Sequence, residues 1–157
     1  MSYDITELAE ESIKLELNVS DMYYLFHSVF PDDASLWWKL GLEEKNHAAL
    51  IRNGIEQFEP VGAFPHEILS DRLQDLKETN KKLRSILQQF KNTQPSTELA
   101  FKTALELEVS SGESHYQYFM DKEANSTIEE VFQRLNREEK DHAERIHSYM
   151  KDNDIPV

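Results

Sequence analysis

KLGLEEKNHA at residues 39–48 and RLNREEKDHA at residues 134–143 share one pattern. Each stretch places a Glu three residues before a His, as Glu44 with His47 and as Glu139 with His142. On an α-helix that spacing puts both side chains on one face, one turn apart. A carboxylate and an imidazole suit Fe, Mn or Zn, so each pair predicts two ligands to one metal ion.

The chain also contains an internal control for this pattern. Glu144 and His147 have the same spacing, but no second copy of their surroundings exists elsewhere in the chain. His147 follows His142 by five residues, which places it about 140° around the helix from His142. We therefore expect Glu144 and His147 to lie on the surface.

The composition predicts an all-α protein. A length of 157 residues suits a single domain with a sizeable core. Few Gly and abundant Leu, Glu and Lys favour helices. The chain has no Cys, which excludes disulfides, thiolate zinc sites and iron–sulfur or rubredoxin-type centres within it.

Charge and hydropathy restrict the expected location and partners. No run of about 18 apolar residues occurs and the first residues, MSYDITELAEE, are acidic, so we expect neither a membrane span nor a signal peptide. The expected location is the cytoplasm. A formal net charge of -13 repels phosphate backbones and anionic lipid but attracts cations such as Fe²⁺. Neither nucleic acid nor a membrane is an expected partner.

Hydrophobic periodicity divides the single domain, residues 1–157, into two helical hairpins and a connection. The first hairpin spans about 4–58, the crossover about 59–96 and the second hairpin about 97–152. The crossover contains an amphipathic helix at about 67–91, with Asn80 on its apolar face. This helix is either part of the crossover or a surface for a second subunit.

The two hairpins are an internal repeat. SIKLE, which ends at Glu16, matches ALELE, which ends at Glu108. Each copy therefore contributes one Glu from its first helix and a Glu-x-x-His from its second. The six candidate metal ligands are Glu16, Glu44, His47, Glu108, Glu139 and His142.

All six candidate ligands fall at inward-facing positions, where an unpaired charge costs several kcal/mol. Two divalent ions would offset that cost. Four carboxylates and two imidazoles are also the ligand set of di-iron carboxylate bundles.

These motifs resemble the rubrerythrin group of the ferritin-like superfamily, and the resemblance spans both hairpins. It implies a ferritin-like four-helix bundle with a helical crossover and two Fe ions, with Mn or Zn as substitutes. Glu44 and Glu139 would bridge the metals, Glu16 and Glu108 would be terminal or switching carboxylates, and each His would hold one metal. Tyr23 and Tyr116, seven and eight residues after their helix Glu, match family tyrosines that hydrogen-bond ligand carboxylates.

The sequence departs from that family in two ways. Ser111 stands where rubrerythrins carry a further Glu, so we expect less preference for peroxide over O₂. If another residue supplies this carboxylate, Glu113 is the nearest candidate. A Cys-bearing rubredoxin domain is absent, so electrons would come from an external donor protein.

The expected function is that of a di-iron oxidoreductase that reduces peroxide or O₂, in oxidant detoxification or Fe²⁺ oxidation, as a homodimer or larger homo-oligomer. One alternative is an iron-binding or storage subunit of a larger assembly with little turnover. Another is a metal-free structural bundle with the site as a relic. The plain interpretation of the single residues is that the Glu residues lie on the surface and that Tyr23 and Tyr116 fill the core with their hydroxyls paired. We expect His115 to be an interior residue, and Trp37 and Trp38 to contribute packing.

Overall fold

The computed structural model describes residues 5–137 and 141–157, and within these residues all regular structure is helical. No described helix is long and apolar enough to cross a membrane. The bounds of the α-helices are α1 Ile5–Val29, α2 Ala34–Phe58, α3 Leu73–Asn92, α4 Thr97–Glu108, α5 Ser111–Asp121, α6 Thr127–Leu135 and α7 His142–Asp152. Three 3₁₀ turns complete the described helices: η1 Pro31–Asp33, η2 Glu59–Val61 and η3 His66–Ile68.

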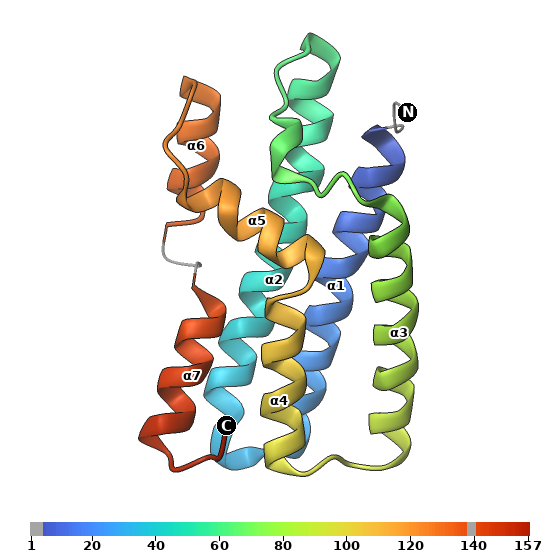
Figure 1. Ribbon diagram of the computed structural model, residues 1–157, viewed down its shortest axis with the longest axis vertical. Coiled ribbons are helices and arrows are strands. Elements are labelled where there is room, and N and C mark those ends of the chain that lie inside the picture. Colours follow the sequence, from blue (N-terminus) through green and yellow to red (C-terminus); the bar gives the residue numbers. More distant parts are fainter. Residues whose placement is uncertain (1–4, 138–140) are drawn as a thin grey trace.

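Helices α1 and α2 form the predicted first hairpin, and they lie side by side along most of their length (Figure 1). Pro31 ends α1 because its ring has no N–H to continue the helix, and α2 begins after the short turn η1. Trp37 of α2 is fully buried and packs against Phe26 of α1 with ring centroids 4.9 Å apart. Aromatic burial of this kind contributes a large part of a core's stability.

Helix α3 is part of the crossover and packs on α1 (Figure 1). Its apolar positions Leu76, Leu83 and Leu87 are buried, as the periodicity predicted. Asn80 interrupts them and accepts a hydrogen bond from Asn18 Nδ2 at 3.1 Å. Asn80 also donates to the backbone oxygen of Glu11, so the polar interruption fixes how α3 docks on α1.

The second hairpin differs from the prediction, because each of its two expected helices is broken. The expected third helix is split into α4 and α5 at Val109 and Ser110, and α5 leaves α4 at an angle (Figure 1). Ser110, with ψ 160°, is extended, and the sequence VSSG at 109–112 has low helix propensity. Gly112 is needed there, because a Cβ would lie 2.3 Å from Leu15 Cδ2.

The expected fourth helix is likewise divided into α6 and α7. Asp141, which precedes α7, has a left-handed backbone with φ 60°. These breaks shift the helical register. Tyr118 and Leu135, which unbroken helices of the same period would turn inward, are 70% and 64% exposed. Tyr116 and Asn136 are buried in the corresponding regions instead.

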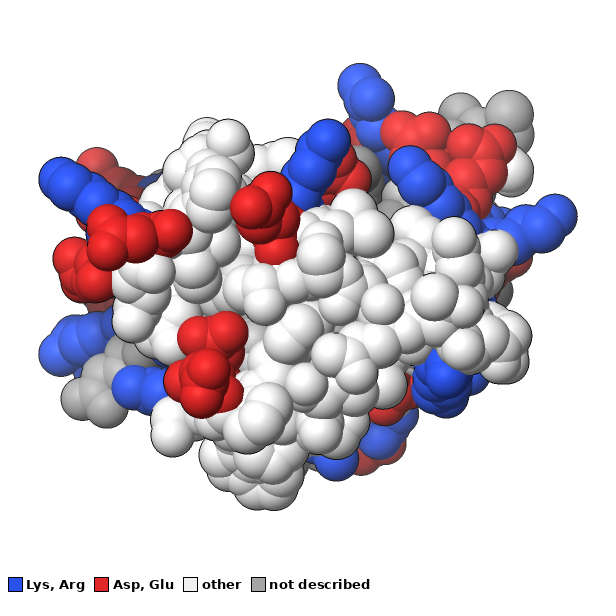
Figure 2. Space-filling view, turned by 90° about the horizontal axis from the view of Figure 1, so that it is seen from below, with Lys and Arg blue, Asp and Glu red and all other residues white. Residues whose placement is uncertain are grey.

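One end of the molecule carries the α1–α2 and α3–α4 connections. Seen from this end, charged side chains lie mainly around the edge and uncharged residues fill the centre (Figure 2). The negative charge of the chain is therefore not concentrated on this face.

Candidate metal centre

The interior between the two hairpins contains five of the six predicted ligands. Glu16 comes from the middle of α1, Glu44 and His47 from α2, Glu108 from the end of α4 and His142 from the start of α7. All five are buried, with exposed fractions of 4% or less. The predicted inward orientation of these five residues is confirmed. Glu139 lies outside the described residues.

These side chains form two groups that share one residue. The first group is Glu16, Glu44, His47 and Glu113, and the second is Glu44, Glu108 and His142. Within each group, one ligand atom per residue lies within 4.8 Å of all the others. Glu44 belongs to both groups.

His142 links the carboxylates of the second group. Its Nδ1 lies 2.8 Å from Glu44 Oε1 and 3.4 Å from Glu108 Oε1. Its Nε2 lies 3.4 Å from Glu43 Oε1. Burial alone would lower the pKa of His142, but the surrounding carboxylates outweigh burial and raise it well above its usual value. The carboxylates therefore favour the protonated form of His142 in the metal-free protein.

His47 holds the corresponding place in the first group. Its Nδ1 lies 3.7 Å from Glu16 Oε2 and 3.5 Å from Glu44 Oε2. The ring stacks on Tyr116 at 4.5 Å and on His142 at 5.3 Å between centroids. These contacts fix the plane of the imidazole, so its Nδ1 faces the carboxylates of the first group.

Glu113 is a buried member of the first group that sequence reasoning named only as a substitute for the missing family carboxylate. It is fully buried because α5 restarts the helix at Ser111, which turns Glu113 rather than Tyr118 inward. A continuous helix would have placed Ser111 on the inward face. Periodicity carried across the break therefore did not single out Glu113 as an inward residue.

The sequence analysis did not single out Glu43, although Glu43, like Glu44, lies about one helical turn before His47. It precedes His47 by four residues, also one helical turn, and it is buried. Both of its oxygens accept hydrogen bonds from Arg145, at 2.6 and 2.7 Å. Burial alone would raise the pKa of Glu43, but the hydrogen bonds from Arg145 and His142 lower it to about 2. Glu43 is therefore more readily ionised than an ordinary Glu, and it faces His142 on the Nε2 side, away from Glu44.

The two tyrosines singled out by the sequence are both buried. Tyr23 donates its hydroxyl proton to Glu108 Oε1 at 2.5 Å, as the prediction of a tyrosine beside a ligand carboxylate requires. Tyr116 donates to Asn136 Oδ1 at 3.0 Å. Asn136 is a buried amide that the sequence analysis did not single out, because it comes from the turn after α6.

Five buried carboxylate oxygens of the cluster have no well-aligned hydrogen-bond partner among the described residues. Glu16 Oε2, Glu44 Oε2, Glu108 Oε2 and both oxygens of Glu113 accept no well-aligned hydrogen bond from a described residue. Burial and repulsion from Glu44 raise the pKa of Glu16 to about 8. Burial and repulsion from Glu113 raise the pKa of Glu44 to about 8. Burial also raises the pKa of Glu113 well above its usual value.

This donor set fits divalent metal ions. Each group offers carboxylate oxygens and one imidazole nitrogen, and these suit Fe, Mn and Zn. A cation would engage oxygens that otherwise lack partners, and it would replace the protons that the raised pKa values imply. Two metal ions sharing Glu44 match the two groups.

The internal control behaves as predicted. Glu144 and His147 are exposed on α7, while His142 on the same helix is buried. His115 is half-buried and belongs to neither ligand group. Of the two Trp residues, Trp37 is buried, but Trp38 is 51% exposed.

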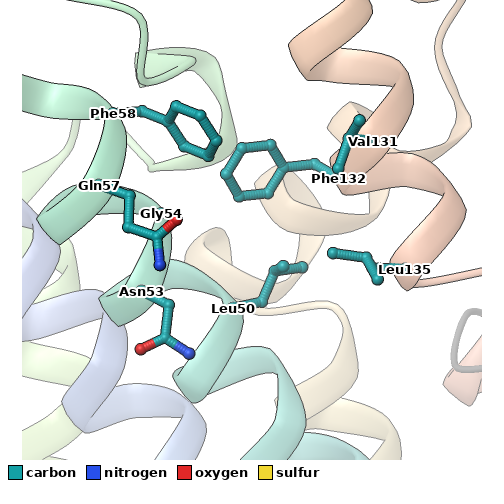
Figure 3. Close-up of a pocket in the computed structure, with 8 residues that line it drawn as sticks. All are labelled: Leu50, Asn53, Gly54, Gln57, Phe58, Val131, Phe132 and Leu135. Carbon is teal, nitrogen blue, oxygen red and sulfur yellow. The ribbon is translucent and has the colours of Figure 1, made fainter. Parts of the chain in front are cut away.

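A separate hollow lies between α2 and α6 and has a volume of about 260 Å³. Its walls are mainly apolar, with Leu50, Phe58 and Phe132 facing it and the amides of Asn53 and Gln57 along α2 (Figure 3). No titratable side chain lines it among the described residues. It therefore lacks the chemistry of the buried cluster.

Comparison with protein-family models, curated proteins and solved structures finds no match to this chain.

Proposed function

We propose that the buried cluster binds two divalent metal ions and that the protein is a non-haem di-iron oxidoreductase. The observation that carries this proposal is the position of Glu44, which belongs to both ligand groups. A carboxylate shared in this way is suited to bridge two metals, and each metal would have its own imidazole, His47 or His142. The resemblance of the sequence motifs to rubrerythrins selects iron from the metals that this donor set accepts.

The fold proposal follows the same resemblance. Helices α1, α2, the α4–α5 pair and the α6–α7 pair would correspond to the four helices of a ferritin-like bundle, with α3 in the crossover. The breaks in the second hairpin fall beside Glu108 and before His142, so they adjoin the cluster. Broken helices at such a place can present ligands that a continuous helix would turn away.

The chain's own residues would orient the ligands and hold protons. Glu43, fixed by Arg145, accepts the Nε2 proton of His142 and so leaves Nδ1 to face the metal. Tyr23 donates to Glu108 and restricts its rotation. Ferrous ions would supply the electrons that reduce peroxide or O₂, and an external donor protein would restore them.

Anaerobic loading with Fe²⁺, followed by exposure to peroxide or O₂, tests this function. We expect two ions per chain and, on oxidation, an absorbance change whose rate depends on the oxidant concentration. Repeated turnover with a reductant supports an oxidoreductase. A large assembly that accumulates far more than two irons per chain would instead support the storage alternative. Absence of bound metal would leave only a structural bundle.

A further inference from the structure

A hollow of about 440 Å³ opens over one half of the cluster. Its residues come from the end of α4, from α5 and from the start of α7. Glu108 and His142, both nearly inaccessible, form its floor, and the exposed Tyr118 stands at its edge. This hollow therefore leads to the second ligand group.

The floor of the hollow contains a polar atom that has no well-aligned hydrogen bond with any described residue. Glu108 is 4% exposed, and its Oε2 accepts no well-aligned hydrogen bond from a described residue, whereas its Oε1 accepts from Tyr23. An unpartnered carboxylate oxygen at the end of an open hollow is suited to receive a cation.

The mouth of the same hollow is acidic. The exposed side chains of Asp141 and Glu144 line it, while the nearby Arg145 is paired with Glu43. Carboxylates at the mouth of a cleft attract cations and raise the rate at which they enter. The mouth and the floor therefore favour the same kind of ligand.

The first ligand group has a different environment. The cavity beside Glu16 has a volume of only about 10 Å³, at the lower limit of what a water molecule requires. Leu15, Ile51 and Ile68 enclose it, and each is 1% exposed. The cavity beside Glu16 is therefore far smaller than the hollow over Glu108 and His142.

We infer that divalent cations enter and leave through the hollow over Glu108 and His142, so the two metal positions exchange at different rates. This inference rests on the proposed two-metal site. The ion held by Glu44, Glu108 and His142 exchanges readily. The ion held by Glu16, Glu44, His47 and Glu113 is retained.

Release of Zn²⁺ to a coloured chelator tests the difference between the two positions. We expect protein loaded with two Zn²⁺ per chain to release them in two phases of equal amplitude. Ser114→Trp fills the hollow and should slow the fast phase several-fold without changing the stoichiometry. The control is Ser148→Trp, which places the same ring on an exposed position of α7 outside this hollow.

The acidic mouth is tested by loading rates. The double variant Asp141→Asn, Glu144→Gln keeps a residue that tolerates the left-handed backbone at position 141 and removes two charges. We expect Zn²⁺ uptake to slow by about tenfold at low ionic strength and the difference to shrink in salt. The control variant Glu56→Gln, Glu98→Gln removes two exposed charges that do not line the hollow.

The possible failures are distinct. A parent protein that binds no Zn²⁺ would remove the two-metal site and the proposed function with it. Two bound ions that leave in a single phase, at a rate that Ser114→Trp does not change, would overturn the inference and leave the proposed function intact. Equal slowing by the two Trp variants, or by the two charge variants, would also overturn it.

Discussion

Nδ1 of His142 lies 2.8 Å from Oε1 of Glu44, which joins the first residue of α7 to the middle of α2 across 98 positions of sequence. These carboxylates favour protonated His142, whose positive charge offsets their mutual repulsion. A metal ion bound by the same two residues would take over this role. Metal binding should therefore release the proton of His142 together with those of the buried Glu residues.

Replacement of His142 by Ala should remove one metal ion per chain and leave the other. The matched control is His147→Ala, because His147 is an exposed imidazole on the same helix. We expect the control to bind metal as the parent does. Elemental analysis of both loaded variants makes the comparison, and equal metal content in the two would refute the role of His142.

Glu43→Gln should lower the affinity for the metal ion beside His142 by about 10–100-fold, because Glu43 orients the imidazole. The variant also leaves Arg145 without its carboxylate, so the metal-free protein should lose about 2 kcal/mol of unfolding free energy. Glu56→Gln, an exposed position on the same helix, is the control. Metal titration separates the two effects, and an unchanged affinity would contradict a positioning role for Glu43.

Metal-free protein should lose stability as the pH rises from about 4.5 to about 8. Over that range folded Glu16 and Glu44 remain protonated, with pKa values of about 8, while the unfolded chain ionises near 4.5. The folded state therefore binds more protons, and rising pH favours unfolding. Glu43 acts in the opposite direction at lower pH, because its pKa of about 2 makes its stabilisation disappear as the pH falls below about 4.5.

Bound metal should reverse this trend between pH 4.5 and pH 8, because metal ions bind ionised carboxylates. Denaturant unfolding with and without Zn²⁺ measures the free energy of unfolding of both forms across this range. We expect the difference between the metal-bound and the metal-free values to increase as the pH rises. Proton release on Zn²⁺ addition at pH 7 provides a direct measure. A difference in unfolding free energy that is independent of pH would show that the buried carboxylates do not bind the ion.

Glu113→Gln should weaken binding of the metal ion held by Glu16 and His47. It should also lower the ratio of the reaction rate with peroxide to the reaction rate with O₂. Since burial raises the pKa of Glu113 well above its usual value, Gln resembles its protonated form, and the metal-free protein should change little in stability at pH 7. Stopped-flow oxidation by each oxidant measures the ratio. Glu123→Gln is an exposed control. An unchanged ratio would mean that Glu113 does not take the role of the family carboxylate.

Much of the first hairpin was predictable because α1 and α2 are continuous helices. A constant period of 3.6 residues then predicts which positions of each helix face inward. The inward positions Glu16 and Phe26 of α1, and Trp37 and Ile51 of α2, are all buried. Asn80 was recognisable as a polar interruption. Its partner Asn18 was not, because that pairing depends on how α3 docks on α1.

The second hairpin was less predictable because its helices break beside the cluster. Helical periodicity assumes that the chain stays helical, but Ser110 is extended and Asp141 is left-handed. Each break resets the register, so Glu113 turns inward where the pattern favoured Ser111. Periodicity also could not predict the ion pair between Glu43 and Arg145, because this pair depends on how α7 is rotated against α2.

The stoichiometry of metal binding in parent protein and in Glu44→Ala tests the central claim most directly. Glu44 is the residue that both ligand groups share. After anaerobic loading with Fe²⁺ and removal of free metal, we expect two ions per chain in the parent and fewer than one in Glu44→Ala, with Glu56→Ala retaining two. One ion or none in the parent, or two ions retained in Glu44→Ala, would contradict a two-metal centre built around Glu44.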